Sequence, residues 1–177
     1  MLLDEKIKQA IRDVKDYPKP GIIFKDITPL LAQPLLMREI VQEFVRRIRP
    51  LKPDAIAAVE ARGFIFGSII AHELDCSFVP VRKAGKLPYK TMSMEYALEY
   101  GTATIEMHAD AIKPNWRVLV HDDLLATGGT ASAAAAMVKD FGAEIAGFTF
   151  LVNLAFLPGE MMLTERFGIK PDSLVTY

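Results

Sequence analysis

The chain has 177 residues, of which 51% are hydrophobic and 24% are charged, so it can bury a sizeable core and is not a disordered protein. Its 21 Lys and Arg residues nearly balance its 22 Asp and Glu residues, which argues against a general nucleic-acid-binding protein. No stretch approaches the roughly 18 uncharged apolar residues of a membrane span. The single cysteine, Cys76, has no partner for an internal disulfide. We therefore expect one cytoplasmic domain over residues 1–177, with neither a nucleic acid nor a membrane as partner.

Two stretches near the start of the chain carry apolar residues at helical spacing. Proline and glycine at 18–21 end the first predicted helix, whose apolar positions are Leu3, Ile7, Ile11 and Val14. The second helix covers about residues 35–48. Further along, strands are predicted at 54–60, 77–81, 117–121 and 144–153, and helices at 63–74 and 129–141. Apolar strands separated by helices favour an α/β fold with a parallel sheet covered on both faces.

The pattern changes between residues 82 and 114. Residues 83–90 are polar and contain Gly85 and Pro88, as expected of an exposed loop. Two alternating segments follow, at 92–96 and 102–107, and their spacing predicts a β-ribbon. A long loop and ribbon inserted into a compact domain usually has a function, so we expect a flexible lid at about 82–110 that covers a site.

The most informative segment is the run from 118 to 130, which reads Val-Leu-Val-His-Asp-Asp-Leu-Leu-Ala-Thr-Gly-Gly-Thr. A buried strand leads to Asp122 and Asp123, and a glycine-rich turn then opens a helix. Ligands bind beyond the carboxyl ends of parallel strands, and backbone N–H groups at a helix N-terminus attract phosphate. The two carboxylates would suit the hydroxyls of a sugar, or a magnesium ion contacted through its waters. The plainer alternative, a solvated strand end and an ordinary helix cap, leaves the second acid and second glycine unexplained.

This run resembles the phosphoribosyl pyrophosphate (PRPP) signature of type I phosphoribosyltransferases, and residues 122–130 are similar to the adenine-specific members in particular. The resemblance extends over about residues 17–157. It implies a twisted, mainly parallel sheet flanked by helices, with an N-terminal hood at about 1–34 and a β-ribbon lid. It also implies a transferase of purine salvage that converts adenine and PRPP to AMP and pyrophosphate with Mg²⁺ as cofactor.

The resemblance assigns roles to residues in five parts of the chain. The 5′-phosphate is expected at Ala126, Thr127, Gly128, Gly129 and Thr130, where a side chain at Gly129 would fill the phosphate space and oppose a positive φ. Adenine is expected at Ile23, Phe24 and Lys25. Pyrophosphate is expected at Glu60, Ala61, Arg62, Arg82 and Lys86. The catalytic set is Glu99, Arg82, Asp122 and Asp123. The metal is held mainly through PRPP and water, without a firm protein ligand, and the protein is expected to be a homodimer.

Four positions depart from the family pattern. Arginine often stands where this chain has Lys25, an aliphatic residue where it has His121, glutamate where it has Asn153, and an Arg-Glu-Lys run commonly follows Gly159. From the residues alone, four plainer alternatives stay open: a core residue at Phe24, a surface arginine at Arg62, a solvated face at the cations of 82–86 and a hairpin tip at Glu99. Two other functions remain open: a phosphoribosyltransferase for another nucleobase, and a PRPP- or purine-sensing regulator of the same fold.

Overall fold

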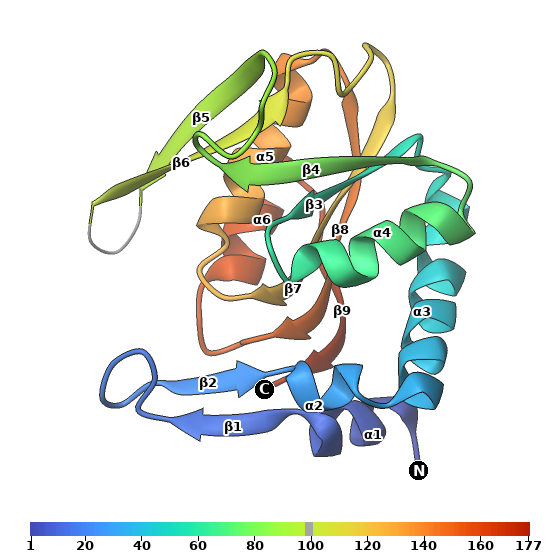
Figure 1. The fold of residues 1–177 in the computed structure, drawn as a ribbon, viewed down its shortest axis with the longest axis vertical. Coiled ribbons are helices and arrows are strands. Elements are labelled where there is room, and N and C mark those ends of the chain that lie inside the picture. The colour runs from blue at the N-terminus through green and yellow to red at the C-terminus, as the bar shows by residue number, and fades with distance from the viewer. Residues whose placement is uncertain (98–100) are drawn as a thin grey trace. The chain divides into compact units, whose positions relative to one another are not determined.

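The computed structural model describes residues 1–97 and 101–177. The chain divides into two compact units, Met1–Phe44 and Val45–Tyr177. Figure 1 labels the helices and strands. Among the described residues, none of the helices is long and apolar enough to cross a membrane.

The first unit is built from a short helix, a two-stranded hairpin and the start of a longer helix. Its elements are α1 (Leu3–Ala10), β1 (Arg12–Lys15), β2 (Ile23–Asp26), α2 (Thr28–Leu31) and most of α3 (Pro34–Ile48). The predicted first helix is therefore too long, because it was expected to include Val14. Instead, β1 pairs antiparallel with β2, and Val14 lies opposite Phe24. Ladder hydrogen bonds outweigh the helical spacing at this β-branched residue.

The second unit contains the main sheet and its helices. It is built from η1 (Arg49–Leu51), β3 (Ala55–Val59), α4 (Gly63–Glu73), β4 (Ser77–Lys83), β5 (Thr91–Ala97), β6 (Thr102–His108), β7 (Arg117–Leu125), α5 (Gly129–Asp140), β8 (Glu144–Asn153), α6 (Gly159–Phe167) and β9 (Asp172–Thr176). Elements β3, α4, β4, α5 and β8 lie close to their predicted ranges, whereas α6 and β9 have no predicted counterpart.

The sheet has seven strands in the order β5-β6-β4-β3-β7-β8-β9 (Figure 1). Five neighbouring strands are parallel to one another, in the order β4-β3-β7-β8-β9. Strands β6 and β5 are added to the β4 edge in antiparallel orientation. All five residues of β3 are buried, as expected for a parallel strand covered on both faces. The predicted fold class, a mainly parallel sheet flanked by helices, is confirmed.

Helices α4 and α5 cover opposite faces of the sheet. Ala57 of β3 belongs to the same apolar cluster as Ala134 of α5. The neighbouring residue, Ala58, faces the other way, and its methyl group lies 2.6 Å from the position that a Cβ on Gly67 of α4 would take. Alternate residues of a strand point to opposite faces, so each helix packs on one of them.

The ribbon predicted at 92–107 is present as β5 and β6. It does not stand apart from the sheet, because β6 pairs with the end of β4 through Arg82 opposite Glu106 and Lys83 opposite Ile105. Strand β4 therefore includes Lys83, which the sequence analysis placed in the exposed loop. The ribbon continues the sheet beyond the carboxyl end of β4, the edge at which ligands bind in such folds.

Candidate active site

The turn between β7 and α5 forms a cradle of backbone N–H groups, Ala126 to Thr130. Gly128 precedes α5 with a φ of +82°, and no side chain caps the helix there. The carbonyl of Gly128 accepts a hydrogen bond from the amide of Ser132 at 2.8 Å. The uncapped first turn leaves N–H groups for an anion at the positive end of the helix dipole. The positive φ lies at Gly128 and not at Gly129, so the expectation for Gly129 is wrong on that point.

Asp122 and Asp123, the acid pair, lie inside β7, shortly before the cradle begins at Ala126. The sequence analysis ended the strand at His121, but the ladder with β8 continues through Asp122 to Leu125. Asp122 Oδ1 accepts a hydrogen bond from the amide of Asp123 at 2.8 Å. Burial, together with the charge of Asp123, raises the pKa of Asp122, and burial also raises the pKa of Asp123. Two carboxylates are thus held close together in a poorly solvated place.

Arg62, which the sequence predicts as an anion-binding residue, lies against the acid pair. Its Nε is 3.0 Å from Asp123 Oδ2, and the Asp123 side chain is only 5% exposed. This ion pair joins the loop after β3 to β7, its neighbour in the sheet. A Cβ on Gly63 would lie 2.8 Å from Asp122 Oδ1, so the close approach of α4 to β7 requires glycine at this position. The structure therefore unites Arg62, Asp122 and Asp123 at one site.

Glu60 and Arg82 form a second ion pair at the same sheet edge. Arg82 Nε lies 2.6 Å from Glu60 Oε2, and the amide of Lys83 donates to Glu60 Oε1 at 3.2 Å. Burial opposes ionisation of Glu60, but the hydrogen bonds from Arg82 and Lys83 outweigh it and lower its pKa. Arg82 also donates to the carbonyl of exposed Lys86 at 3.0 Å. The peptide bond between Glu60 and Ala61 is cis.

The ribbon reaches the phosphate cradle through Tyr96. Thr130 Oγ1 donates a hydrogen bond to the hydroxyl of Tyr96 at 3.0 Å. A Cβ on Gly129 would lie 3.4 Å from Tyr96 Cδ2, so the ring also lies beside the glycine turn. Sequence reasoning missed Tyr96, because nothing in its local pattern distinguishes it from an ordinary strand tyrosine. Glu99, predicted as catalytic, lies outside the described residues.

The three residues predicted to bind adenine lie on β2 of the first unit. Ile23 is 50% exposed, and the ring of Phe24 makes an edge contact with Tyr17 at a centroid distance of 5.2 Å. Lys25 is buried, and its Nζ lies 2.7 Å from Asp13 Oδ1 across the hairpin. The ammonium group of Lys25 is thus paired with Asp13 across the hairpin.

The start of helix α6 packs against the cradle. The amide of Gly159 donates to the carbonyl of Ala126 at 3.1 Å. A Cβ on Gly159 would collide with that same carbonyl oxygen, so this contact needs glycine. Sequence reasoning missed the contact because it recorded Gly159 only as part of an atypical run. No local signal in the sequence predicts this contact, because it depends on the packing of α6 against the turn after β7.

His121 precedes the acid pair and is completely buried. Burial lowers its pKa to about 3, so it is neutral at ordinary pH. A Cβ on Gly67 of α4 would lie 3.3 Å from His121 Cδ2, which places the imidazole under that helix. His121 is thus a neutral, buried side chain packed between β7 and α4.

The comparisons with known proteins agree with this geometry. A family model described as a phosphoribosyl transferase domain matches residues 26–155. The chain belongs to the phosphoribosyltransferase family. Within this family, it is 55% identical over 176 residues to the adenine phosphoribosyltransferase of Cytophaga hutchinsonii, covering 99% of this chain and 97% of the relative.

Solved structures of phosphoribosyltransferases are similar to this chain in fold as well as in sequence. The crystal structure of adenine phosphoribosyltransferase from Thermoanaerobacter pseudethanolicus matches with a TM-score of 0.94 and 45% identity, over 99% of this chain and 100% of that one. The Saccharomyces cerevisiae adenine phosphoribosyltransferase, solved in complex with an imino-altritol bisphosphate and adenine, matches with a TM-score of 0.90 and 33% identity, over 97% and 98% of the two chains. These relatives all belong to the adenine-specific branch.

Proposed function

We propose that this chain is a glycosyltransferase of purine salvage that transfers the 5-phosphoribosyl group of PRPP to adenine, forming AMP and releasing pyrophosphate. The observation that carries the proposal is the cradle at residues 126–130, which lies on the same sheet edge as Asp122, Asp123 and Arg62. A phosphate site, a pair of carboxylates and a cation in this order fit the 5′-phosphate, hydroxyls and pyrophosphate of PRPP. The adenine specificity rests on the similarity to adenine phosphoribosyltransferases.

Each part of PRPP has residues that would hold it. Backbone N–H groups and hydroxyls of the cradle, Ala126, Thr127, Gly128, Gly129 and Thr130, bind the 5′-phosphate. Asp122 and Asp123 accept hydrogen bonds from the ribose hydroxyls. The pyrophosphate binds at the loop Glu60, Ala61 and Arg62 and at the cations Arg82 and Lys86. The pairing of Arg62 with Asp123 and of Arg82 with Glu60 supports this division, because each carboxylate holds a guanidinium at the sheet edge.

The reaction requires alignment and charge neutralisation more than covalent chemistry. The bond from C1 of ribose to pyrophosphate loosens before the adenine nitrogen bonds, and C1 gains positive character. Arg62, Arg82 and Lys86 neutralise the departing pyrophosphate, and the carboxylates beside the ribose stabilise the positive C1. The lid at about 82–110 excludes water that would otherwise hydrolyse PRPP.

The base and its proton are assigned to two further segments. Phe24 stacks on adenine, and backbone groups of Ile23 and Lys25 read its hydrogen-bonding edge. The ion pair of Lys25 with Asp13 supports a backbone role for this residue. The proton at N7 of the base is assigned to Glu99, as the resemblance to the family implies.

Mg²⁺ is the proposed cofactor. When bound, it adds positive charge to the pyrophosphate and so assists its departure. Among residues 1–97 and 101–177, no three carboxylate, histidine or cysteine side chains converge on a metal position. The donor set nevertheless fits a metal held mainly by PRPP and water, because the oxygens of Asp122 and Asp123 are the ligand type that Mg²⁺ prefers. We further propose that the chain acts as one catalytic domain and as a cytoplasmic homodimer, with a single cysteine suited to a reducing compartment.

The test is a base-by-base assay. The purified chain is incubated with PRPP and Mg²⁺ and with adenine, guanine, hypoxanthine, xanthine or orotate separately, and the nucleotide and pyrophosphate are quantified. We expect AMP from adenine with the highest kcat/KM. A higher kcat/KM with another base would refute the adenine assignment, and no nucleotide from any base would refute the enzymatic assignment.

A further inference from the structure

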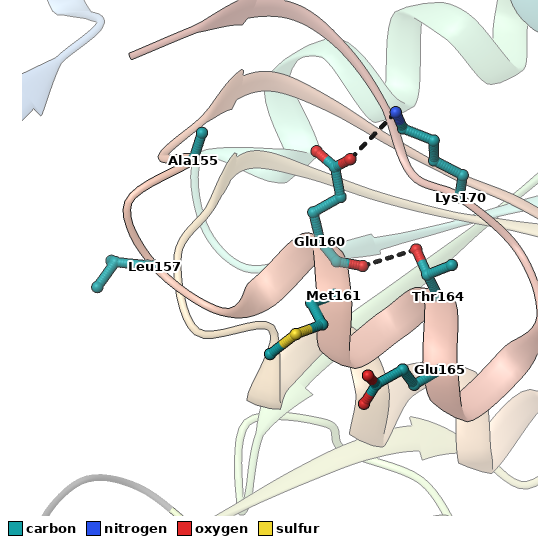
Figure 2. A pocket seen from close by; sticks show the side chains of 7 residues that line it. All are labelled: Ala155, Leu157, Glu160, Met161, Thr164, Glu165 and Lys170. Carbon is teal, nitrogen blue, oxygen red and sulfur yellow. Dashed lines mark hydrogen bonds and ion pairs between the residues drawn. The ribbon is translucent and has the colours of Figure 1, made fainter.

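The first turn of α6 borders a pocket of about 550 Å³, and Figure 2 shows the side chains that line it. The carboxylate of Glu160 points across this pocket, where Oε1 lies 3.2 Å from Lys170 Nζ (Figure 2). Its other oxygen, Oε2, accepts a hydrogen bond of 2.8 Å from Asn153 Nδ2. One carboxylate thus joins the end of β8, the start of α6 and the segment after α6.

The hydrogen bond from Asn153 to Glu160 anchors the first turn of α6 to the end of β8. Asn153 is only 3% exposed and ends β8 opposite Leu125, the last residue of β7. The amide of Leu154 donates to the carbonyl of Leu125 at 3.0 Å, which fixes this end of the sheet. A hydrogen bond between a carboxylate and a buried amide is stronger than one between neutral groups. Glu160 therefore attaches α6 to a rigid part of the core.

The residue before Glu160 touches the cradle directly. Besides the hydrogen bond from its amide to Ala126, Gly159 lies so close to the glycine turn that a Cβ on Gly128 would be 3.1 Å from Gly159 Cα. Farther along α6, Arg166 donates to Ser132 Oγ of α5 at 2.7 Å. Backbone contacts this close transmit small displacements, because packed interiors do not deform continuously.

We propose that Glu160 is a positioning residue for the phosphate cradle. Its carboxylate fixes the first turn of α6, and Gly159 in that turn fixes the carbonyl of Ala126 and with it the N–H groups that receive the 5′-phosphate. Glu160 touches neither substrate nor the reacting atoms. The inference rests on the proposed function, because it assumes that the cradle binds the phosphate of PRPP.

The test compares two variants of Glu160 with matched variants of Glu165. Glu165 lies on the same helix, lines the same pocket and is exposed, and no ion pair or side-chain hydrogen bond of Glu165 is seen among the described residues. We expect Glu160→Ala to raise KM for PRPP about tenfold, and Glu160→Gln, which keeps an acceptor for Asn153, about two- to threefold. In both variants, kcat and KM for adenine stay within about twofold of wild type, because the interaction serves PRPP binding alone.

The controls separate this role from a general loss of stability. Glu165→Ala and Glu165→Gln are expected to keep the wild-type KM for PRPP. Should Glu160→Ala fail to fold, Glu160→Gln and Lys170→Met carry the test, since each removes only the ion pair of Glu160 with Lys170. Unchanged KM for PRPP in all folded Glu160 variants overturns the proposal, and so does an equal rise in KM for both substrates.

A direct binding measurement distinguishes failure of this inference from failure of the proposed function. Titration calorimetry with PRPP and Mg²⁺, without adenine, reports the cradle independently of turnover. Weaker PRPP binding in Glu160→Ala than in wild type supports the positioning role. Equal binding by both proteins overturns it while leaving the enzyme assignment intact. A wild-type protein that neither binds PRPP nor makes AMP refutes the proposed function, and the inference fails with it.

Discussion

The hydroxyl groups of Thr130 and Tyr96 meet at 3.0 Å, although they lie 34 residues apart in the chain. Thr130 belongs to the first turn of α5 and Tyr96 to strand β5 of the ribbon. The contact means that the ribbon does not merely extend the sheet. It is attached to the cradle that we propose as the site of the 5′-phosphate.

The Tyr96→Phe variant tests this attachment. It removes the hydroxyl and keeps the ring beside Gly129, so we expect the fold to be unaffected. Loss of one neutral hydrogen bond is worth about 0.5–1.5 kcal/mol, which corresponds to a rise of roughly 2- to 12-fold in KM for PRPP. Steady-state kinetics measure the effect. Tyr89→Phe, on an exposed tyrosine before the ribbon, is the control and should behave as wild type. Wild-type KM in Tyr96→Phe would disprove a role for the contact.

The two cradle glycines should respond differently to alanine. Gly128 has a φ of +82°, and a Cβ there would lie 3.1 Å from Gly159 Cα and from Met162 Cε. Holding a non-glycine residue at positive φ costs about 1–3 kcal/mol, so we expect Gly128→Ala to lower Tm by several degrees. Gly129 has neither constraint, and a Cβ would make only an ordinary contact with Tyr96. Thermal melts of Gly129→Ala should therefore match wild type.

At Gly129, a larger side chain tests the phosphate site itself. Gly129→Val should retain the fold but fill the space of the 5′-phosphate, so PRPP binding by calorimetry should fall below detection. A folded Gly129→Val protein with unchanged PRPP affinity would contradict the cradle assignment. Equal losses of Tm in the alanine variants of Gly128 and Gly129 would contradict the distinction between them.

The ionised acid pair should lower the stability of the folded protein, although the proposed function requires both carboxylates. Burial and the charge of Asp123 raise the pKa of Asp122 above its ordinary value. The folded state therefore binds the proton more tightly than the unfolded state, and stability falls as pH rises from the ordinary pKa toward the raised one. At a pH above the raised pKa, the full loss of folding stability caused by ionised Asp122 is present. Asp122→Asn removes it, and about 1 kcal/mol would raise Tm at pH 7.5 by roughly 2–4 °C.

The same substitution should impair catalysis. Asp122 is proposed to accept a hydrogen bond from a ribose hydroxyl, and a hydrogen bond to a charged group is worth about 1.5–3 kcal/mol, so kcat/KM for PRPP should fall roughly 10- to 150-fold. Thermal melts and kinetics on one preparation give both values. A lower Tm together with full activity would contradict the assignment of Asp122 on both counts.

Local parts of the site could be predicted from sequence, and long-range ones could not. Asp122, Asp123 and the cradle are nearly contiguous, so a strand followed by a glycine turn is enough to place them. The ion pair of Arg62 with Asp123 depends on β3 lying next to β7, which follows only from the strand order. The contact of Gly159 with Ala126 depends on α6, a helix that local periodicity did not reveal.

The secondary-structure errors have the same origin. Val14 continues the helical spacing of Ile7 and Ile11, and only the partner strand β2 explains why it is extended. Strand β9 has five residues after Pro171 and is held by β8, so its own sequence carries a weak signal. By contrast, β8 has a long apolar run, and its predicted bounds of 144–153 match the structure. Elements with a strong local pattern were predicted, and elements defined by a neighbour were not.

His121 gives a prediction on pH dependence. Burial lowers its pKa from 6.5 to about 3, so the folded state keeps the imidazole neutral where the unfolded state takes up a proton. Its contribution to stability is complete above the unfolded pKa and is lost progressively as pH falls from 6.5 toward 3. Within this window, each pH unit costs at most about 1.4 kcal/mol. His121 by itself should therefore lower Tm between pH 7 and pH 5, while the raised pKa of Asp122 and of Asp123 acts in the opposite direction.

His121→Val tests whether this residue lowers Tm in this range. Valine suits a buried strand and cannot be protonated, so the variant should lose less Tm between pH 7 and pH 5 than wild type. His72→Gln is the matched control, because His72 is exposed on α4 and should leave the wild-type pH profile unchanged. Activity at pH 7.5 distinguishes packing from catalysis: a packing residue predicts a His121→Val kcat within a few-fold of wild type. A loss of about 10²- to 10⁴-fold in a stably folded variant would instead indicate proton transfer by His121.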